Sequence, residues 1–383
     1  MKMEFRDLKR QYERYKDEID KAINEVILET QFIGGKFVDL FEKRLEEYVG
    51  VKHAITCANG TDAMSLIMMA WNIGEGDAVF VPDFTFFSTG EIVSYCGATP
   101  IFVDVDSDTF NIDSLKLISA IERVISEEKL IPRVIIPVDL FGLPAEYEKI
   151  IEIADKYNLK VLEDAAQSFG GSIKGKKTCS FGDAATTSFF PAKPLGCYGD
   201  GGAVFTDDDI LAEKLRSLKI HGKGANKYEN ARIGVNSRLD TIQAAILNVK
   251  LDAFIAHELH EVNEVYNQYN QRLEGYVKIP IIPMNYYSSF AQYTIVCKCK
   301  LERDRLKIWL EKNCIPCMIY YIKPMHKQEA FQDLKFNENM FDVSNKLSET
   351  VLSLPMHPYL KIYEIDKICN LIIEFYDKIY QNE

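Results

Sequence analysis

The sequence lacks the long apolar runs and the excess positive charge that two large classes of protein require. No stretch approaches 18 consecutive apolar residues, so we expect no membrane-spanning helix. The formal net charge of the 383 residues is −12, and no basic stripe with interleaved aromatic residues is present, which argues against nucleic-acid binding. Residues 1–9 are charged and contain no apolar core of a secretory signal. We therefore expect a cytoplasmic protein.

Paired metal-binding cysteine motifs are also missing. The nine cysteines are an odd number in a chain without an export signal, and reduced thiols are the natural interpretation. A four-thiolate site could be imagined, but its spacing lacks the repeated C-x-x-C pattern of zinc sites. Cys297 and Cys299 fit better as small core residues on one face of a strand. We expect no metal. The four cysteines of the imagined site are Cys297, Cys299, Cys314 and Cys317.

What the sequence does contain is an alternation of short apolar runs with stretches of helical apolar spacing. This alternation, between residues 53 and 220, predicts an α/β fold whose mostly parallel sheet carries helices on both faces. Such sheets bind ligands at the carboxyl ends of their strands. The expected strands span residues 53–57, 78–81, 101–105, 134–138, 160–162, 184–190 and 203–206.

The pattern changes on either side of this region. Apolar spacing predicts amphipathic helices over 6–30 and 37–49, and one long helix over 238–273. After the long helix the chain indicates a smaller α+β unit, which includes a strand over 317–322. The expected domains are a large one over residues 1–275 and a small C-terminal one over residues 276–383.

One lysine stands on a constrained turn in the segment SFFPAKPLGCYGDGG, from Ser188 to Gly202. Pro191 and Pro194 flank Lys193 and prevent a regular helix through it, because each proline fixes φ and removes a backbone donor. A lysine that is partly stripped of water loses its proton more readily and becomes a nucleophile for carbonyl groups. Most lysines lie in solvent instead, so neighbouring motifs must decide between these two interpretations.

Three further motifs fall where strands end or helices begin. Asn59-Gly60-Thr61-Asp62 opens a helix, and its free N–H groups and hydroxyl suit an anion, although ordinary capping uses the same residues. Asp164 follows a buried run, where a carboxylate needs a cationic partner unless it only caps the next element. Phe86 follows a strand, where an aromatic either joins the core or stacks on a ring. A ligand that satisfies all of them has a phosphate, a basic aromatic nitrogen and an aldehyde, as pyridoxal 5′-phosphate (PLP) does.

Over residues 5–360 the chain resembles the DegT/DnrJ/StrS family of nucleotide-sugar aminotransferases. That resemblance implies the PLP-dependent transferase fold of type I and aminotransferase activity. The motifs that carry it are CANGTDA, PDFTFFST, EDAAQSFG, SFFPAKPLG-x-x-GDGG, GVNSRLDTIQAAIL, YYIKPMHKQ and SLPMHPYL.

The resemblance also implies which residues hold the cofactor. Lys193 is expected to bind PLP covalently and later to shuttle protons, and Asp164 to pair with the pyridine nitrogen. Gln167 is expected near the phenolic oxygen, and Phe86 stacked on the ring. The expected phosphate ligands are Gly60, Thr61 and Ser188.

By the same resemblance, Asn236 reaches the phosphate bound by the neighbouring subunit, which makes a homodimer the minimal active unit. Four residues are expected on the substrate side, namely Arg238, His221, Tyr321 and His326. Arg238 is equally compatible with a salt bridge at the start of a helix, and His326 with a hydrogen-bonded loop residue.

The expected reaction is a ping-pong transamination in which L-glutamate donates the amino group and a keto sugar receives it. Pro194, in place of the asparagine frequent in the family, resembles the branch that acts at C3 of UDP-sugars, as do the motifs GVNSRLDT and SLPMHPYL. Gln167 favours the same branch, because C4 enzymes often carry histidine there. The expected substrate is a UDP-linked 2-acetamido-3-keto hexuronate, and the product is expected to enter lipopolysaccharide O-antigen or a related glycan.

Other readings stay open at this point. One is a C4 aminotransferase on a UDP- or dTDP-4-keto-6-deoxy sugar, and another is a 3-aminotransferase on UDP-3-keto-GlcNAc. A PLP-dependent sugar dehydratase on the same scaffold has histidine in place of the lysine, so Lys193 argues against it. A non-catalytic regulator predicts erosion around the cofactor, whereas the expected cofactor residues are all present.

Overall fold

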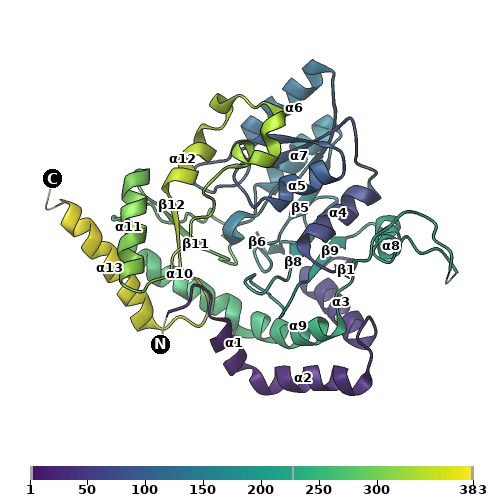
Figure 1. Cartoon of the computed structure of the whole chain (residues 1–383), viewed down its shortest axis with the longest axis horizontal. Coiled ribbons are helices and arrows are strands. Elements are labelled where there is room, and N and C mark those ends of the chain that lie inside the picture. Colours follow the sequence, from purple (N-terminus) through teal and green to yellow (C-terminus); the bar gives the residue numbers. More distant parts are fainter. Residues whose placement is uncertain (1–2, 227, 381–383) are drawn as a thin grey trace.

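A seven-stranded sheet forms the centre of the larger part of the molecule (Figure 1). The computed structural model describes residues 3–226 and 228–380. The strand order is β1-β9-β8-β5-β4-β2-β3, in which only β9 runs antiparallel to both of its neighbours. The predicted α/β fold with a mostly parallel sheet is confirmed. The strands are β1 (His53–Cys57), β2 (Asp77–Pro82), β3 (Thr99–Val103), β4 (Ile131–Ile135), β5 (Lys160–Asp164), β8 (Ala184–Ser188) and β9 (Gly202–Thr206).

Helices cover both faces of this sheet because its strands are apolar on both sides. On β2, Val81 packs into one hydrophobic cluster with Ile67, and the adjacent Phe80 packs into the opposite cluster with Ile121. Side chains alternate between the faces of a strand, so consecutive apolar residues need cover on both. The covering helices are α4 (Gly60–Ala70), α5 (Ser88–Tyr95), α6 (Ser114–Glu127), α7 (Tyr147–Tyr157) and α8 (Asp209–Leu218).

The N-terminal helices lie at the edge of the molecule below the sheet in Figure 1, where α2 packs along α9. The helical stretch predicted over residues 6–30 is broken at Tyr15, whose φ of −119° departs from helical geometry. Residues 238–273 are likewise not one regular helix, because a π-helical turn separates two α-helical parts. These helices are α1 (Leu8–Arg14), α2 (Lys16–Glu29), α3 (Lys36–Val49), α9 (Thr241–Ala253), η2 (Phe254–Glu258) and α10 (Leu259–Leu273).

The C-terminal part has its own hydrophobic core around the antiparallel pair β11–β12. Tyr269 of α10 packs in this core with Leu306, Leu354 and Ile368, so α10 belongs to the C-terminal packing although it precedes residue 276. The domain division at residue 275 stays a prediction. The elements here are β11 (Tyr293–Val296), α11 (Lys300–Lys312), α12 (Asp342–Thr350), β12 (Val351–Leu354) and α13 (Ile362–Tyr380).

The strand predicted over residues 317–322 does not form. Met318 makes only an isolated bridge to Ser353, and Pro316 and Pro324 limit the pairing on either side. The remaining elements are short. They are β6 (Ser172–Ile173), β7 (Lys176–Lys177), β10 (Tyr286–Tyr287), and the 3₁₀ turns η1 (Leu140–Gly142), η3 (Met325–Lys327), η4 (Glu329–Leu334) and η5 (Glu338–Met340).

All nine cysteines are unpaired. Among residues 3–226 and 228–380, no helix has both the length and the apolar character that a bilayer crossing demands. Within the same described residues, no three or more His, Cys, Asp or Glu side chains are grouped so that they could hold a metal ion.

Candidate active site

Lys193 lies on the turn that follows β8. The turn is closed by two backbone hydrogen bonds, from Lys193 N–H to the Phe190 carbonyl at 2.8 Å and from Cys197 N–H to the Phe189 carbonyl at 2.8 Å. A Cβ atom on Gly196 would lie 2.5 Å from the Pro191 carbonyl oxygen, which no side chain tolerates. The chain therefore doubles back here only because residue 196 is glycine, and Lys193 is held at a fixed place.

The ammonium of Lys193 is easier to deprotonate than an exposed one. The pKa of Lys193 is lowered to about 8, because burial, with a smaller contribution from the charge of Arg6, outweighs the raising effect of the charge of Asp164. Removal of water penalises the charged form of the amine. About a tenth of Lys193 is therefore the neutral, nucleophilic amine at pH 7, and about half of it at pH 8.

Asp164 ends β5 with its carboxyl buried. Thr89 Oγ1 donates a hydrogen bond to Oδ2 at 2.9 Å, and the Ala166 N–H donates to Oδ1 at 3.2 Å. Burial raises the pKa of Asp164, while these two donors and the charge of Lys193 lower it. Two donors leave part of the carboxylate's accepting capacity unused, and a protonated ring nitrogen is a cation that can use it.

The N-terminus of α4 meets the end of β8. Asn59 Oδ1 caps the helix by accepting from the Asp62 N–H at 2.8 Å, so Gly60 and Thr61 open its first turn. A Cβ atom on Gly60 would lie 2.9 Å from Ser188 Cβ, so the helix start and the Ser188 hydroxyl are side by side. Thr61 Oγ1 hydrogen-bonds Ser88 Oγ at 2.7 Å. Helix N–H groups together with three hydroxyls make an anion site.

Gln167 connects the end of the sheet to the C-terminal part of the chain. Its Oε1 accepts from the Phe141 N–H at 2.9 Å, and its Nε2 donates to Tyr321 Oη at 3.1 Å. The ring of Tyr321 lies 6.4 Å from the ring of Phe86, which is 55% exposed. Gln167, Tyr321 and Phe86 thus follow one another around the place where a cofactor ring would sit, and Phe86 leaves a face free for stacking.

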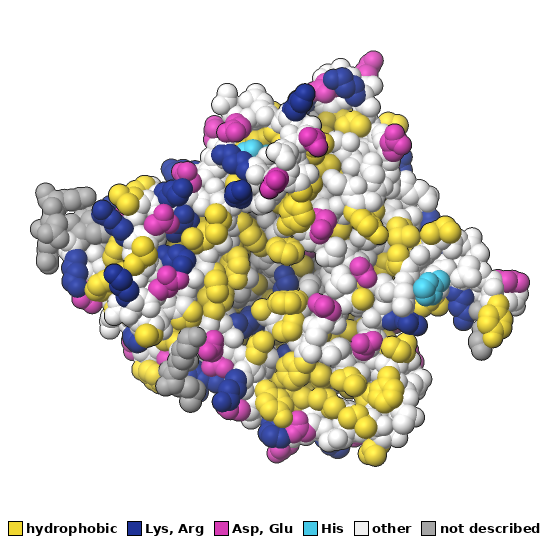
Figure 2. Space-filling view, viewed as in Figure 1, with side chains coloured by type: hydrophobic (Ala, Val, Ile, Leu, Met, Phe, Trp, Pro, Cys, Tyr) yellow, Lys and Arg dark blue, Asp and Glu magenta, His cyan; other side chains and the backbone are white. Residues whose placement is uncertain are grey.

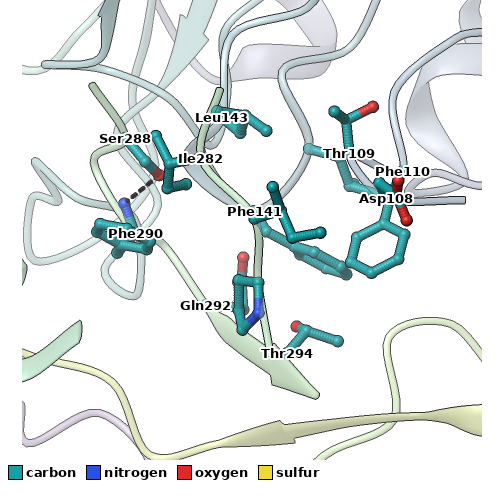
Figure 3. A pocket seen from close by; sticks show the side chains of 13 residues that line it. Asp108, Thr109, Phe110, Phe141, Leu143, Ile282, Ser288, Phe290, Gln292 and Thr294 are labelled. Atoms are coloured by element: carbon teal, nitrogen blue, oxygen red, sulfur yellow. Dashed lines mark hydrogen bonds between the residues drawn. The ribbon is translucent and has the colours of Figure 1, made fainter. Parts of the chain in front are cut away.

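Behind Gln167, the Phe141 side chain points into a small pocket between residues 108–110 and residues 280–294 (Figure 3). Its ring lies edge-on to the ring of Phe110, at 5.8 Å between centroids. On the far wall Ser288 Oγ accepts from the Phe290 N–H at 3.1 Å. Apolar and polar side chains line this pocket, and the residue whose ring enters it is also the residue whose backbone N–H holds Gln167.

The residue expected at the subunit boundary, Asn236, lies at the surface, as do two of the residues expected on the substrate side, Arg238 and His221. Asn236 is exposed and bridges to Ile220, and Arg238 is exposed beside it, where both line a hollow with Gly199 and Asp200. His221 is exposed with a φ of 63°. Residues 221–226 and 228–236 project beyond α8 at the margin of the molecule (Figure 1).

His326 is placed differently from the other expected substrate residues. It is buried, its Nδ1 pairs with Asp83 Oδ2 at 2.7 Å, and its backbone N–H donates to Asp83 Oδ1 at 2.9 Å. Its ring stacks on Phe341 at 4.3 Å. These contacts tie η3 to the loop that carries Phe86, which is the hydrogen-bonded loop role considered for His326 from the sequence.

Sequence reasoning missed several polar residues around the site. Thr89 and Ser88 are two of them, and both stand at the end of the motif PDFTFFST, where a polar residue next to the ligand could have been expected. Asp139 and Glu163 are two buried carboxyls behind Asp164, and the Asp139 N–H donates to the Asp164 carbonyl at 3.1 Å. No local sequence pattern predicts that these two carboxyls meet, because they lie on different structural elements.

The described residues fit PLP. The structure brings a hydroxyl-lined helix N-terminus, a buried carboxyl with unused accepting capacity, an exposed aromatic face and a lysine amine to one end of the sheet. A phosphate, a pyridine nitrogen, an aromatic ring and an aldehyde are the groups that these four features suit.

Comparisons with known proteins agree with this geometry. Residues 13–373 match the DegT/DnrJ/EryC1/StrS aminotransferase family. UDP-2-acetamido-2-deoxy-3-oxo-D-glucuronate aminotransferase of Pseudomonas aeruginosa is 44% identical over 96% of this chain and 98% of its own length. A DegT/DnrJ/EryC1/StrS aminotransferase from Brucella abortus has a solved structure that is 48% identical, with a TM-score of 0.95 over 98% of this chain and 99% of that one.

A third relative bears on the cofactor. The solved structure of NtdA from Bacillus subtilis contains bound PMP, the amino form of PLP. It is 27% identical, with a TM-score of 0.85 over 95% of this chain and 82% of that one. The expected cofactor, the transferase fold and the aminotransferase class are thereby confirmed. The chain belongs to the DegT/DnrJ/EryC1/StrS aminotransferase family.

Proposed function

We propose that this aminotransferase moves the amino group of L-glutamate to the C3 keto group of a UDP-linked 2-acetamido-3-keto hexuronate. The observation that supports the chemistry is the buried amine of Lys193, whose pKa is lowered to about 8 on a turn next to Asp164. The substrate rests on the 44% identity to an enzyme named for a UDP-linked 3-oxo-glucuronate. The product would serve the synthesis of a bacterial surface glycan such as O-antigen, in the cytoplasm.

The roles proposed for the cofactor residues follow from their placement. Lys193 bonds to PLP, and its freed amine takes a proton from the donor's α-carbon. Bound PLP supplies an electron sink for the charge that this proton leaves behind. Asp164 holds a proton on the ring nitrogen, and Gln167 orients the ring from the side of Tyr321. Gly60, Thr61 and Ser188 bind the phosphate.

On the substrate side, Arg238, His221 and Tyr321 are proposed to contact the donor or the sugar nucleotide. His326 is proposed to act through Asp83 on the Phe86 loop, because its Nδ1 is engaged there at 2.7 Å. Replacement of Tyr321 by phenylalanine should therefore raise KM and release Gln167 as well, whereas replacement of His326 should chiefly lower stability.

We further propose a homodimer in which Asn236 contacts the phosphate bound by the other subunit. Hydrophobic side chains gather on the face over α2, α3 and α9 (Figure 2), and Leu28, Phe32 and Ile33 there are 83%, 47% and 46% exposed. Phe190, in the Lys193 turn, is 50% exposed. Contiguous apolar surface of this kind next to a site is typical of a subunit interface.

An absorbance experiment tests the proposal. The protein loaded with PLP should show a visible band that L-glutamate converts to the absorption of the pyridoxamine form, and the 3-keto sugar nucleotide should restore the band. NMR of the product should place the new amine at C3. Lys193→Ala should show no visible band and no turnover.

Three results would contradict the proposal. An unchanged band with L-glutamate would reject this donor, and an amine at C4 would favour the alternative C4 aminotransferase. Turnover retained in Lys193→Ala would mean that another lysine is the base.

A further inference from the structure

Two basic side chains, those of Arg6 and Lys250, donate hydrogen bonds to backbone carbonyls of the Lys193 turn. Arg6 Nη2 donates to the carbonyl of Lys193 at 2.8 Å and to the carbonyl of Pro194 at 3.4 Å. Lys250 of α9, only 2% exposed, donates through Nζ to the carbonyl of Gly196. The prolines leave these carbonyls without a helix or a sheet to pair them, and a buried carbonyl without a donor is costly. Arg6 and Lys250 therefore supply the hydrogen bonds of the turn.

We propose that Arg6 and Lys250 are positioning residues for Lys193: both hold the backbone of its turn, and the charge of Arg6 keeps its amine free for attack. Neither residue belongs to the motifs that indicated the cofactor. The inference rests on the proposed role of Lys193 as the residue that bonds to PLP. In that bond the neutral amine attacks the aldehyde carbon, a C=N bond forms, and the aldehyde oxygen leaves as water with both amine protons.

The charged groups around Lys193 come from four elements. Asp164 faces it from β5 and Arg6 from the N-terminal segment, while Lys250 of α9 and Glu258 of η2 face Arg6 and each other. Glu258 accepts a hydrogen bond from Tyr359 and is the carboxylate opposite the two cations. His357 also lies near Arg6, and its pKa is lowered to about 4 by burial and by the charge of Arg6, so it adds no positive charge at neutral pH.

The two cations differ in what they contribute. Burial lowers the pKa of Arg6 to about 10 and that of Lys250 to about 7, so Arg6 stays charged at neutral pH while Lys250 is partly neutral. A permanent positive charge beside an amine favours its neutral form. Arg6 should thus affect both the position and the protonation of Lys193, and Lys250 its position alone.

Capture of PLP by the apoprotein, followed by absorbance between pH 6 and pH 10, separates these contributions. The capture rate of the unaltered protein should rise with pH around a midpoint near the pKa of Lys193, about 8. Arg6→Gln removes the charge and should move the midpoint upward by about half a unit or more, which slows capture at pH 7 about threefold. Arg6→Lys keeps the charge and should keep the midpoint. Lys250→Met should slow capture equally at every pH.

The controls use the same segment and the same reaction. Lys9→Gln removes an exposed cation of the same segment, which pairs with Glu13 one turn along its own helix, and it should leave the midpoint unchanged. Thermal melting reports whether each variant is folded. An unchanged midpoint in folded Arg6→Gln overturns the role of Arg6. An unchanged capture rate in Lys250→Met overturns the role of Lys250. If Arg6→Gln does not fold, Lys250→Met still tests whether the hydrogen bonds of the turn matter. Capture by Lys193→Ala at the normal rate would instead reject the proposed function.

Discussion

At the scale of single residues, the carboxyls of Asp139, just before η1, and of Glu163 on β5 are both fully buried. Asp139 accepts from Ser168 Oγ at 2.6 Å, Tyr147 Oη at 2.8 Å and the Ala145 N–H at 2.8 Å. Burial raises the pKa of Asp139 to about 7, and burial together with the charge of Asp139 raises the pKa of Glu163 well above its usual value. At neutral pH the folded pair therefore keeps a proton, whereas both carboxyls are deprotonated in the unfolded chain.

This retained proton predicts the pH dependence of stability. Because the folded pKa of Asp139 lies above the unfolded value of about 3.9, the folded state binds more protons, and the free energy of unfolding falls as pH rises from about 4 to about 7. Asp139→Asn should reduce this fall by about 2 kcal/mol. Urea denaturation of the apoprotein at pH 5 and at pH 7.5 measures the fall in the free energy of unfolding. Equal falls in both proteins would contradict the prediction, and the lysine titrations cancel because both proteins share them.

At the scale of elements, the phosphate site depends on how closely β9 approaches α4. A Cβ atom on Gly202, the first residue of β9, would lie 2.4 Å from the backbone of Asn59. Asn59 caps α4, so the strand sets the position of the helix N-terminus. The glycine is required here by a close backbone approach, which is a different reason from a turn.

Gly202→Ala should therefore weaken binding of the phosphate group. The added methyl must displace the backbone at Asn59, at a cost of about 1–3 kcal/mol, and move Gly60 away from Ser188. Equilibrium titration with pyridoxal and with PLP measures the change, since only PLP carries the phosphate. Gly74→Ala is the matched control, because its Cβ meets nothing closer than 3.5 Å. Equal loss of affinity for both ligands would mean that the phosphate site is intact.

The sequence predicted elements better than contacts between them. The apolar runs that alternate with helical stretches predict where the parallel strands occur. A strand buried on both faces has consecutive apolar residues, such as Phe80 and Val81, and these are visible in the sequence. The strand predicted over residues 317–322 was wrong, because an apolar segment forms a strand only where a neighbouring strand is available for pairing. The roles of Arg6 and Lys250 could not be predicted, since they depend on carbonyl groups 187 and 54 residues away.

At the scale of the whole molecule, the apolar face over α2 and α3 is the feature that a single chain leaves unexplained. Leu28 is 83% exposed and Leu40 is 49% exposed. A folded monomer gains nothing from such exposure, whereas burial yields about 25 cal/mol for each Å² removed from water. The proposed homodimer would cover this surface.

Leu28→Asp should therefore shift the protein from dimer to monomer, because burial of an unpaired charge opposes association. Light scattering after size-exclusion chromatography, over a range of protein concentrations, measures the shift. Leu115→Asp on α6 is the matched control, since Leu115 is 74% exposed and lies outside the apolar face. A monomeric wild-type protein, or an unaltered dimer in Leu28→Asp, would contradict the prediction.

The contact between Arg6 and Lys193 also bears on the order in which the site is completed during synthesis. Arg6 is translated 187 residues before Lys193, whose carbonyl it holds. The N-terminal segment is also anchored through Arg10 to Tyr359 and Glu364, which are made later still. A ribosome-bound chain that already contains Lys193 thus lacks the anchored arginine beneath it. The reactive amine therefore matures only after residue 364 has been made, and a nascent chain that ends before that residue should capture little cofactor.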